Sequence, residues 1–181
     1  VKCIRPIGIY PQEGVAVIAD SYWAALQGRK VLKIEWEEPN DLPSTEQLFQ
    51  TMRQVASKKG VVDTQVGDFE TTYTKATVQL TANYETPFLA HAPMEPINTL
   101  VWVKADSCVI WSGVQHPLWV QSEAAKLLGW NKEQIKVHCP FIGGSFGRKG
   151  LPDFNLEGVL LSKQLQKPVK IIWTRADDIQ Q

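Results

Sequence analysis

The segment Ile142–Lys149, which reads IGGSFGRK, has the residue types most suited to chemistry in this chain. Three glycines in five positions remove Cβ atoms where a backbone turns sharply or approaches a ligand closely. Consecutive N–H groups in such a loop converge on an anion or an oxo group, and two cations follow. We therefore predict a loop that presents backbone donors to a large, electron-rich ligand. The predicted contact residues are Gly143, Gly144, Ser145, Phe146, Gly147 and Arg148. Without further context, such a loop is more often a tight turn.

Gln115 is the second candidate, because it lies where a predicted strand (107–112) passes into a predicted helix. A glutamine there offers its side-chain N–H or C=O to a ligand, beside the backbone N–H groups of the helix start. One helix and one strand separate it from the glycine loop, and such a connection returns the chain to the same edge. We expect Gln115 and the loop to face one ligand. Taken alone, Gln115 is a surface or capping residue.

The elements that must position these residues are predicted from periodicity and caps. Residues 1–40 contain a strand at 15–19, a helix at 21–27 ended by Gly28, and an alternating strand at 31–36. A turn-rich acidic linker at 37–43 marks a boundary. Beyond it we predict a helix at 44–59 opened by a Ser44/Gln47 capping box, strands at 72–84, 99–104, 107–112, 134–138 and 169–173, and helices at 117–128 and 154–165, the last capped by Asp153.

The order of these elements lacks a clean parallel rhythm and favours a mixed α+β fold with helices packed on a mixed sheet. We predict that residues 1–40 are the C-terminal part of a small α/β domain. Residues 41–181 then form the N-terminal part of a second domain. Because the chain starts without Met and stops after a predicted strand, we expect it to be a piece of a longer polypeptide.

Composition excludes several functions. The chain has 181 residues with 19 basic and 19 acidic side chains, so no basic footprint for nucleic acid is expected. No apolar run approaches the roughly 20 residues that span a bilayer. The 3 cysteines are widely spaced without a CxxC pair, which argues against a zinc or iron–sulfur site made by this chain alone.

Five ordered motifs together resemble the molybdenum-binding subunit of the xanthine dehydrogenase/aldehyde oxidase family. The resemblance is closest to isoquinoline 1-oxidoreductase β-subunits and membrane-bound aldehyde dehydrogenases. It covers nearly the whole chain. The motifs are 14–36, ending KIEW; 90–96, AHAPMEP; 111–117, WSGVQHP; 143–148, GGSFGR; and 168–175, PVKIIWTR.

The resemblance implies a role for each candidate. Gln115 matches the glutamine that hydrogen-bonds an oxygen ligand of molybdenum, and Gly144–Arg148 match the loop that lies against the molybdenum–pterin group. It implies a molybdenum–pterin cofactor in its cytosine dinucleotide form, and hydroxylation of an aldehyde or aromatic N-heterocycle with water as oxygen source. Electrons would leave through [2Fe–2S] clusters on a partner subunit, in some relatives toward a cytochrome c. A bacterial, periplasm-facing location is implied. The catalytic glutamate lies C-terminal to this chain in that family, so the chain alone is expected to be inactive.

The chain departs from the family pattern at Ser145, where a third glycine is usual, and at Ala176, where an acidic residue is common. If position 145 needs a positive φ, the serine is strained. Arg148 pairs either with a pterin or phosphate oxygen or with Asp153. Glu95 is either a substrate-side carboxylate or the partner of a nearby cation, and we expect the second. We expect the carboxylates at 177–178 to be solvated. His91 either lines the substrate side or is an ordered loop residue.

Two other functions stay open at this point. A nucleotide-binding dehydrogenase module requires GxGxxG directly after a strand, whereas this loop reads GGxxG and follows Pro140-Phe141. In a non-catalytic interaction domain, the glycine loop is only a turn.

Overall fold

The computed structural model describes residues 2–4, 14–35 and 42–180. Contacts divide the chain into two units, residues 1–32 with 88–181 and residues 33–87. Each unit is described by itself below. The predicted division into residues 1–40 and 41–181 stays a prediction.

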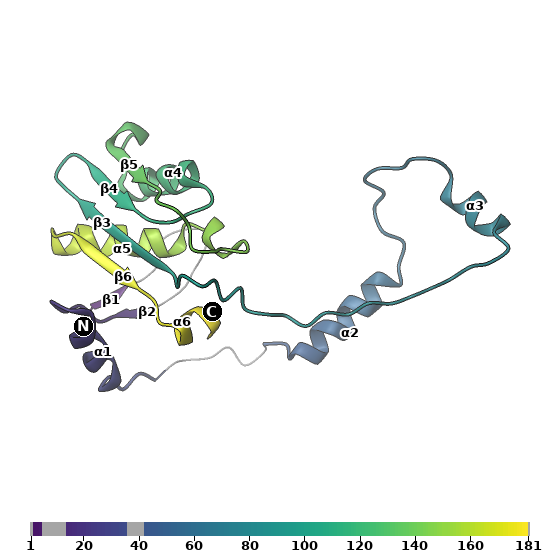
Figure 1. Cartoon of the computed structure of the whole chain (residues 1–181), viewed down its shortest axis with the longest axis horizontal. Helices are drawn as coiled ribbons and strands as arrows, with labels where there is room; N and C mark the ends of the chain where they lie inside the picture. The colour runs from purple at the N-terminus through teal and green to yellow at the C-terminus, as the bar shows by residue number, and fades with distance from the viewer. Residues whose placement is uncertain (1, 5–13, 36–41, 181) are drawn as a thin grey trace. The chain divides into compact units, whose positions relative to one another are not determined.

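A four-stranded mixed sheet forms the centre of the first unit (Figure 1). Its strands are β3 (Asn98–Val103), β4 (Cys108–Trp111), β5 (Ile135–His138) and β6 (Val169–Ile172), in the order β5-β4-β3-β6. β3 runs antiparallel to β4 and β6, whereas β4 and β5 are parallel. The predicted hairpin, both later strands and the mixed α+β class are confirmed.

Two helices cover one face of this sheet: α4 (Pro117–Leu128) and α5 (Asp153–Leu165). The core between the helices and the strands includes the apolar side chains of Val101, Ile110 and Phe154, which are 0% exposed. Gly158 brings α5 close to β3, since a Cβ there would lie 2.7 Å from the side chain of Val101. Pro152, not Asp153, is the N-cap of α5, so the predicted cap is wrong by one residue. Asp153 instead points to the glycine loop, as shown below.

The other face of the sheet carries Trp102 and Trp111, both exposed. Lys104 lies over the Trp102 ring, and the His138 ring stacks on Trp111 with centroids 5.4 Å apart. The position of His138 in an alternating strand predicts such a structural role. This face therefore holds packing interactions between side chains of neighbouring strands.

The N-terminal part of the first unit differs from the predicted β-α-β order. β1 (Lys2–Ile4) pairs antiparallel with β2 (Gly14–Ala16), and α1 (Tyr22–Lys30) follows. α1 continues past Gly28 to Lys30, and Gly28 lies so close to Val17 that a Cβ on this glycine would be 3.0 Å from the valine side chain. Gly28 therefore serves packing and does not end the helix. Residues 31–35 form no strand, and Trp36 lies outside the described residues.

The chain's last described element is α6 (Arg175–Gln180). The expectation of solvated carboxylates here is wrong. Asp178 is 4% exposed and pairs with Arg175 at 2.7 Å, and Asp177 pairs with Arg29 of α1. Asp177 also accepts from the N–H of Thr174 at 2.8 Å, so it ties α1 to the turn before α6.

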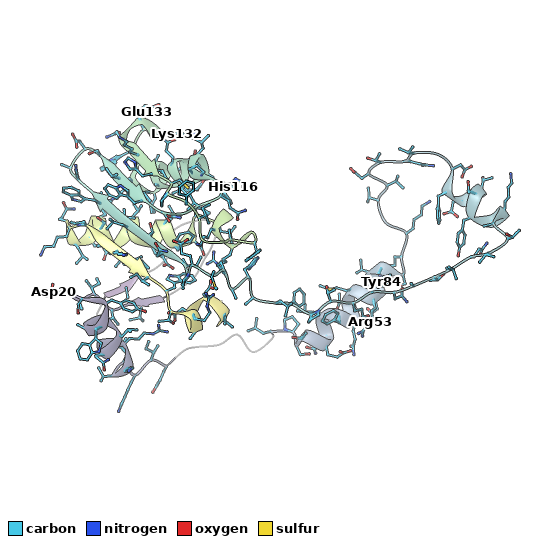
Figure 2. The ribbon with its side chains drawn as sticks, viewed as in Figure 1. Asp20, Arg53, Tyr84, His116, Lys132 and Glu133 are labelled. Carbon is cyan, nitrogen blue, oxygen red and sulfur yellow. The ribbon has the colours of Figure 1, made fainter. Side chains whose placement is uncertain are left out.

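The second unit contains α2 (Thr45–Ala56) and α3 (Phe69–Lys75). The Ser44/Gln47 capping box is confirmed, and the helix ends three residues earlier than predicted. The predicted strand at 72–84 is wrong: Asp68 caps α3 by accepting from the Thr71 N–H, and none of residues 72–84, all of which the structure describes, forms a strand. Arg53 of α2 pairs with Glu85 at 2.6 Å, which holds the returning chain against α2 (Figure 2).

Within the described residues, no helix is long and apolar enough to cross a membrane.

Candidate functional site

The glycine loop follows β5 and contains an unusual concentration of positive backbone φ angles. Gly144, Phe146 and Gly147 have φ values of 94°, 54° and 99°. Phe146 is 76% exposed, so neither burial nor packing offsets the cost of its left-handed conformation. Ser145 is not among the positive-φ residues, so the strain considered for a serine at this position is absent. The loop conformation demands glycine on either side of Ser145 and Phe146 but not at Ser145 itself.

The N–H groups of residues 144–147 make no hydrogen bond with any residue that the structure describes. The next amides along the chain differ, because the Arg148 N–H donates to the Ser145 C=O at 3.0 Å. Positive φ angles lie on both sides of Ser145. Successive amides in such a turn form a concave group of donors that suits an anion or oxo group. The loop therefore carries a run of donors with nothing from the described chain to accept them.

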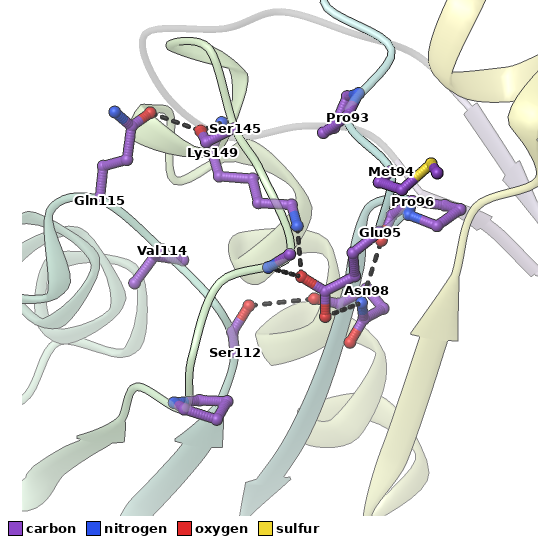
Figure 3. Close-up of polar contacts among 12 residues, drawn as sticks. Pro93, Met94, Glu95, Pro96, Asn98, Ser112, Val114, Gln115, Ser145 and Lys149 are labelled. Atoms are coloured by element: carbon purple, nitrogen blue, oxygen red, sulfur yellow. Dashed lines mark hydrogen bonds and ion pairs between the residues drawn. The ribbon is translucent and has the colours of Figure 1, made fainter.

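Gln115 lies directly against this loop, and two contacts hold it there (Figure 3). Its backbone N–H donates to the Lys149 C=O at 3.0 Å, and its side-chain Oε1 lies 2.5 Å from Ser145 Oγ. Ser145 Oγ in turn accepts from the Lys149 N–H at 2.9 Å. Gln115 also immediately precedes His116, the N-cap of α4. The structure thus brings together the two segments that the sequence predicted would face one ligand.

Glu95 and Lys149 form an ion pair that holds the two ends of the glycine loop. Lys149 is 1% exposed, and its Nζ lies 2.5 Å from Glu95 Oε2. The same oxygen accepts from the Gly143 N–H at 3.0 Å, and Asn98 donates to the other oxygen at 3.2 Å. Burial acts to raise the pKa of Glu95, but the hydrogen bonds from Lys149, Gly143 and Asn98 outweigh it and lower that pKa. The expected pairing of Glu95 with a cation is present.

The close approach of Glu95 explains why Gly143 is a glycine. The Glu95 N–H donates to the Gly143 C=O at 2.9 Å. Together with the bond from the Gly143 N–H to the Glu95 carboxylate, two hydrogen bonds therefore join these residues. A Cβ at position 143 would lie 2.5 Å from the Glu95 Cβ. The first glycine of the loop therefore serves packing, whereas Gly144 and Gly147 serve the turn.

Arg148 adopts the alternative pairing considered for it. Its guanidinium donates to both carboxylate oxygens of Asp153, at 3.1 and 2.8 Å, in a bidentate pair. The guanidinium lies 5.1 Å from the centroid of the Trp173 ring and 6.0 Å from that of Phe154. These contacts tie the C-terminal end of the loop to α5 and to the end of β6. A contact between Arg148 and a cofactor stays a prediction.

Glu157, one turn after Asp153, was not identified from the sequence. Burial and the nearby Asp153 carboxylate raise its pKa to about 7, although Trp173 donates a hydrogen bond to it and Arg148 lies near. A carboxyl with such a pKa changes charge near neutral pH. Glu157 thus adds a titratable group beside the Arg148–Asp153 pair that holds the end of the loop.

The segment 91–94 forms the other side of the loop. Ala92 has a φ of 38° and is, after Phe146, the second non-glycine residue of this site in a strained conformation. Arg175 donates to the Pro93 C=O at 2.5 Å and fixes this segment to α6. The ring of exposed His91 lies by Gly147, 3.7 Å from the place of a Cβ there. His91 is therefore close enough to the loop to contact a ligand bound on it.

No group of three or more His, Cys, Asp or Glu side chains in the described part of the chain is placed to hold a metal ion. The donors that the loop offers are amides and a carboxamide, which bind acceptor oxygens. Such a donor set fits the oxygen-rich periphery of a pterin or oxo group, and not a bare cation.

Comparison with known proteins identifies the family. Residues 51–181 match the model of the molybdopterin cofactor-binding domain. The chain belongs to this family. The resemblance that the five motifs carry is thereby confirmed.

Curated relatives agree. The chain is 27% identical to the isoquinoline 1-oxidoreductase subunit beta of Brevundimonas diminuta, over 92% of this chain and 23% of that one. It is also 27% identical to the aldehyde oxidoreductase molybdenum-binding subunit PaoC of Escherichia coli K12, over 92% of this chain and 22% of that one. The chain thus spans less than a quarter of the length of both relatives.

Among solved structures, the chain resembles quinoline 2-oxidoreductase from Pseudomonas putida 86, with a TM-score of 0.66 and 21% identity. The similarity covers 88% of this chain and 21% of that one. At this identity the likeness concerns the fold.

Proposed function

We propose that this chain is the cofactor-facing part of a molybdenum hydroxylase subunit, which oxidises an aldehyde or an aromatic N-heterocycle with water as oxygen source. The single observation that carries the proposal is the contact between Gln115 and the loop, where a carboxamide lies beside four amides that have no partner among the described residues. Family membership supplies the identity of the group that these donors would hold. When bound, that group supplies the redox chemistry.

The residues of this chain would bind and orient the cofactor. The N–H groups of residues 144–147 would donate to its acceptor oxygens, and the Gln115 side chain would donate beside them. Arg148 would add positive charge at the end of the loop while it stays paired with Asp153. Aimed donors of this kind matter: at other oxyanion sites, loss of one costs about 100- to 1000-fold in rate.

Several finer features are part of the same proposal. We infer a cofactor in its cytosine dinucleotide form, [2Fe–2S] clusters on a partner subunit as the first electron acceptor, and in some settings a cytochrome c after them. A bacterial, periplasm-facing location and the absence of catalysis by this chain alone belong with it. These features rest on the family resemblance of the sequence motifs. The names of the relatives, which are subunits of oxidoreductases, support the expectation of partner subunits.

The test is Gln115→Ala in the full-length subunit, purified with its partners from its own host. Wild-type protein should contain molybdenum and a fluorescent pterin. We expect the variant to keep most of its molybdenum and to lose turnover by about 100-fold, in a panel that includes benzaldehyde and isoquinoline. Unchanged turnover would reject the role of Gln115. Absence of molybdenum and pterin from the wild type would reject the proposed function.

An NAD(H) titration of the same wild-type protein tests the alternative of a nucleotide-binding dehydrogenase module. We expect no binding. Saturable binding at micromolar concentration, with no molybdenum present, would favour that alternative.

A further inference from the structure

The side-chain orientation of Gln115 follows from what surrounds Ser145. Ser145 is 8% exposed, so its hydroxyl has little access to water. A hydroxyl has one proton to donate and two lone pairs. The Lys149 N–H occupies one lone pair at 2.9 Å, and Gln115 Oε1, at 2.5 Å, is the acceptor in reach of the proton.

The opposite orientation of the carboxamide would leave the Ser145 proton without an acceptor in the described part of the chain. An unsatisfied buried donor is costly, by about 1–3 kcal/mol at typical sites. The contact therefore selects one of the two orientations of the Gln115 amide. With Oε1 held by Ser145, the NH₂ group of Gln115 points away from the hydroxyl (Figure 3).

We propose that Ser145 is a positioning residue, whose hydroxyl turns the two N–H donors of Gln115 toward the ligand held by the loop. The inference rests on the proposed function for the identity of that ligand. It does not depend on that function for the orientation itself. The backbone at position 145 has no positive φ, so it accepts a serine without strain. A glycine there would make the same turn but would have no hydroxyl to orient the Gln115 carboxamide.

The test compares Ser145→Ala and Ser145→Thr with a matched control, Ser162→Ala. Ser162 is 0% exposed, and its hydroxyl also accepts from a backbone N–H (Val103, 2.9 Å) and donates to a C=O (Lys167, 2.7 Å). Ser162 therefore reports the general effect of losing a buried hydroxyl with the same bonding pattern. It makes no contact with Gln115.

The first readout is independent of turnover. In the full-length protein labelled with ¹⁵N in glutamine side chains, Gln115→Ala identifies the Gln115 NH₂ signals by their disappearance. We expect Ser145→Ala to shift and broaden these signals, Ser145→Thr to keep them near their wild-type positions, and Ser162→Ala to leave them unchanged. If Ser145→Ala does not fold, Ser145→Gly takes its place with the same expectation. Unmoved signals, or an equal shift in the Ser162 control, would overturn the proposal.

The second readout is turnover of benzaldehyde or isoquinoline, whichever the wild type oxidises. We expect kcat to fall about tenfold in Ser145→Ala, since one net hydrogen bond contributes about this factor. Molybdenum content and KM should stay close to wild type, and Ser145→Thr should recover at least half of kcat. A wild-type kcat in Ser145→Ala, with Gln115→Ala impaired, would overturn the positioning role and leave the proposed function standing. If Gln115→Ala is itself fully active, the assigned role of Gln115 fails, and the NMR signals still decide the orientation.

Discussion

Gly143 and Glu95 approach each other so closely that position 143 has no room for a side chain. An alanine there would place its Cβ 2.5 Å from the Glu95 Cβ and 3.3 Å from Oε2. Both atoms belong to Glu95, whose backbone is hydrogen-bonded to Gly143 and whose carboxylate is paired with Lys149. Relief of the clash therefore requires Glu95 to move and these contacts to open. We expect Gly143→Ala to lower the free energy of unfolding by about 2 kcal/mol, measured by urea denaturation.

Gly113 provides the matched control, since it also lies beside the Glu95 carboxylate. A Cβ there would meet Oε2 at 3.5 Å, which is an ordinary contact, and its φ is not positive. Gly113→Ala should change the free energy of unfolding by less than about 0.5 kcal/mol, or raise it slightly through the unfolded state. Equal losses in both variants would contradict the packing explanation.

The residues of the site differ in how far the sequence could reveal them. Gln115 and the glycine loop carry local signals, namely a strand-to-helix junction and a run of glycines, and both were identified. The partners of Gln115 and Glu95 could not be, because Ser145 lies 30 residues from the first and Lys149 lies 54 residues from the second. Lys149 reads as a surface cation in the sequence and is fully buried in the structure. Contacts at such separations depend on the fold, and no local pattern encodes them.

Helix α5 supports the loop through Asp153 and carries Glu157 one turn later, so its stability depends on pH. The Glu157 pKa is raised from 4.5 to about 7 in the folded protein. A raised carboxyl pKa means that the folded state holds the proton more tightly than the unfolded state does. Ionisation of Glu157 in the folded protein therefore lowers the free energy of unfolding. This cost is absent below pH 4.5, grows between pH 4.5 and 7, and is complete above pH 7.

Glu157→Gln removes this penalty, because the amide is neutral at every pH. Compared with wild type, we expect the free energy of unfolding of the variant to rise with pH, by about 3 kcal/mol in total between pH 4.5 and 8. Parallel urea denaturation series at pH 4.5, 6, 7 and 8 measure the difference, and the comparison at pH 4.5 gives the effect of the substitution itself. A difference that stays constant over this range would show that Glu157 ionises normally.

Elements with a buried face followed their sequence patterns, and so did α2, whose start is set by its local capping box, whereas the predicted strand at 72–84 did not form. The strands β3 to β6 and the helices α4 and α5 alternate or repeat against a common core, and their predicted positions agree with the structure to within about two residues. The stretch 72–84 also alternates, but alternation predicts a strand only where a neighbouring strand completes the hydrogen bonds. All its side chains are exposed in the second unit, and Asp68 starts a helix instead. Similarly, β2 pairs with the more N-terminal β1, a pairing that no local pattern announces.

At the scale of the whole molecule, the chain matches less than a quarter of the length of the relatives above. The donors at 144–147 and Gln115 belong to one assembly of loops in the first unit, and Phe146 projects from it with 76% of its surface exposed. Ligand sites ordinarily enclose most of a ligand's surface. One loop assembly supplies directional hydrogen bonds, but binding must also offset the loss of translational and rotational freedom.

The chain by itself should therefore bind the molybdenum–pterin cofactor weakly. We expect the 181-residue chain, produced in a host that makes the cofactor, to contain far less than one molybdenum per chain after gel filtration, whereas the full-length subunit from the same host is loaded. Metal analysis and pterin fluorescence of both preparations make the comparison, and circular dichroism of the short chain checks that it is folded. A stoichiometric complex that survives gel filtration would show that these loops alone hold the cofactor, without contacts from the rest of the subunit.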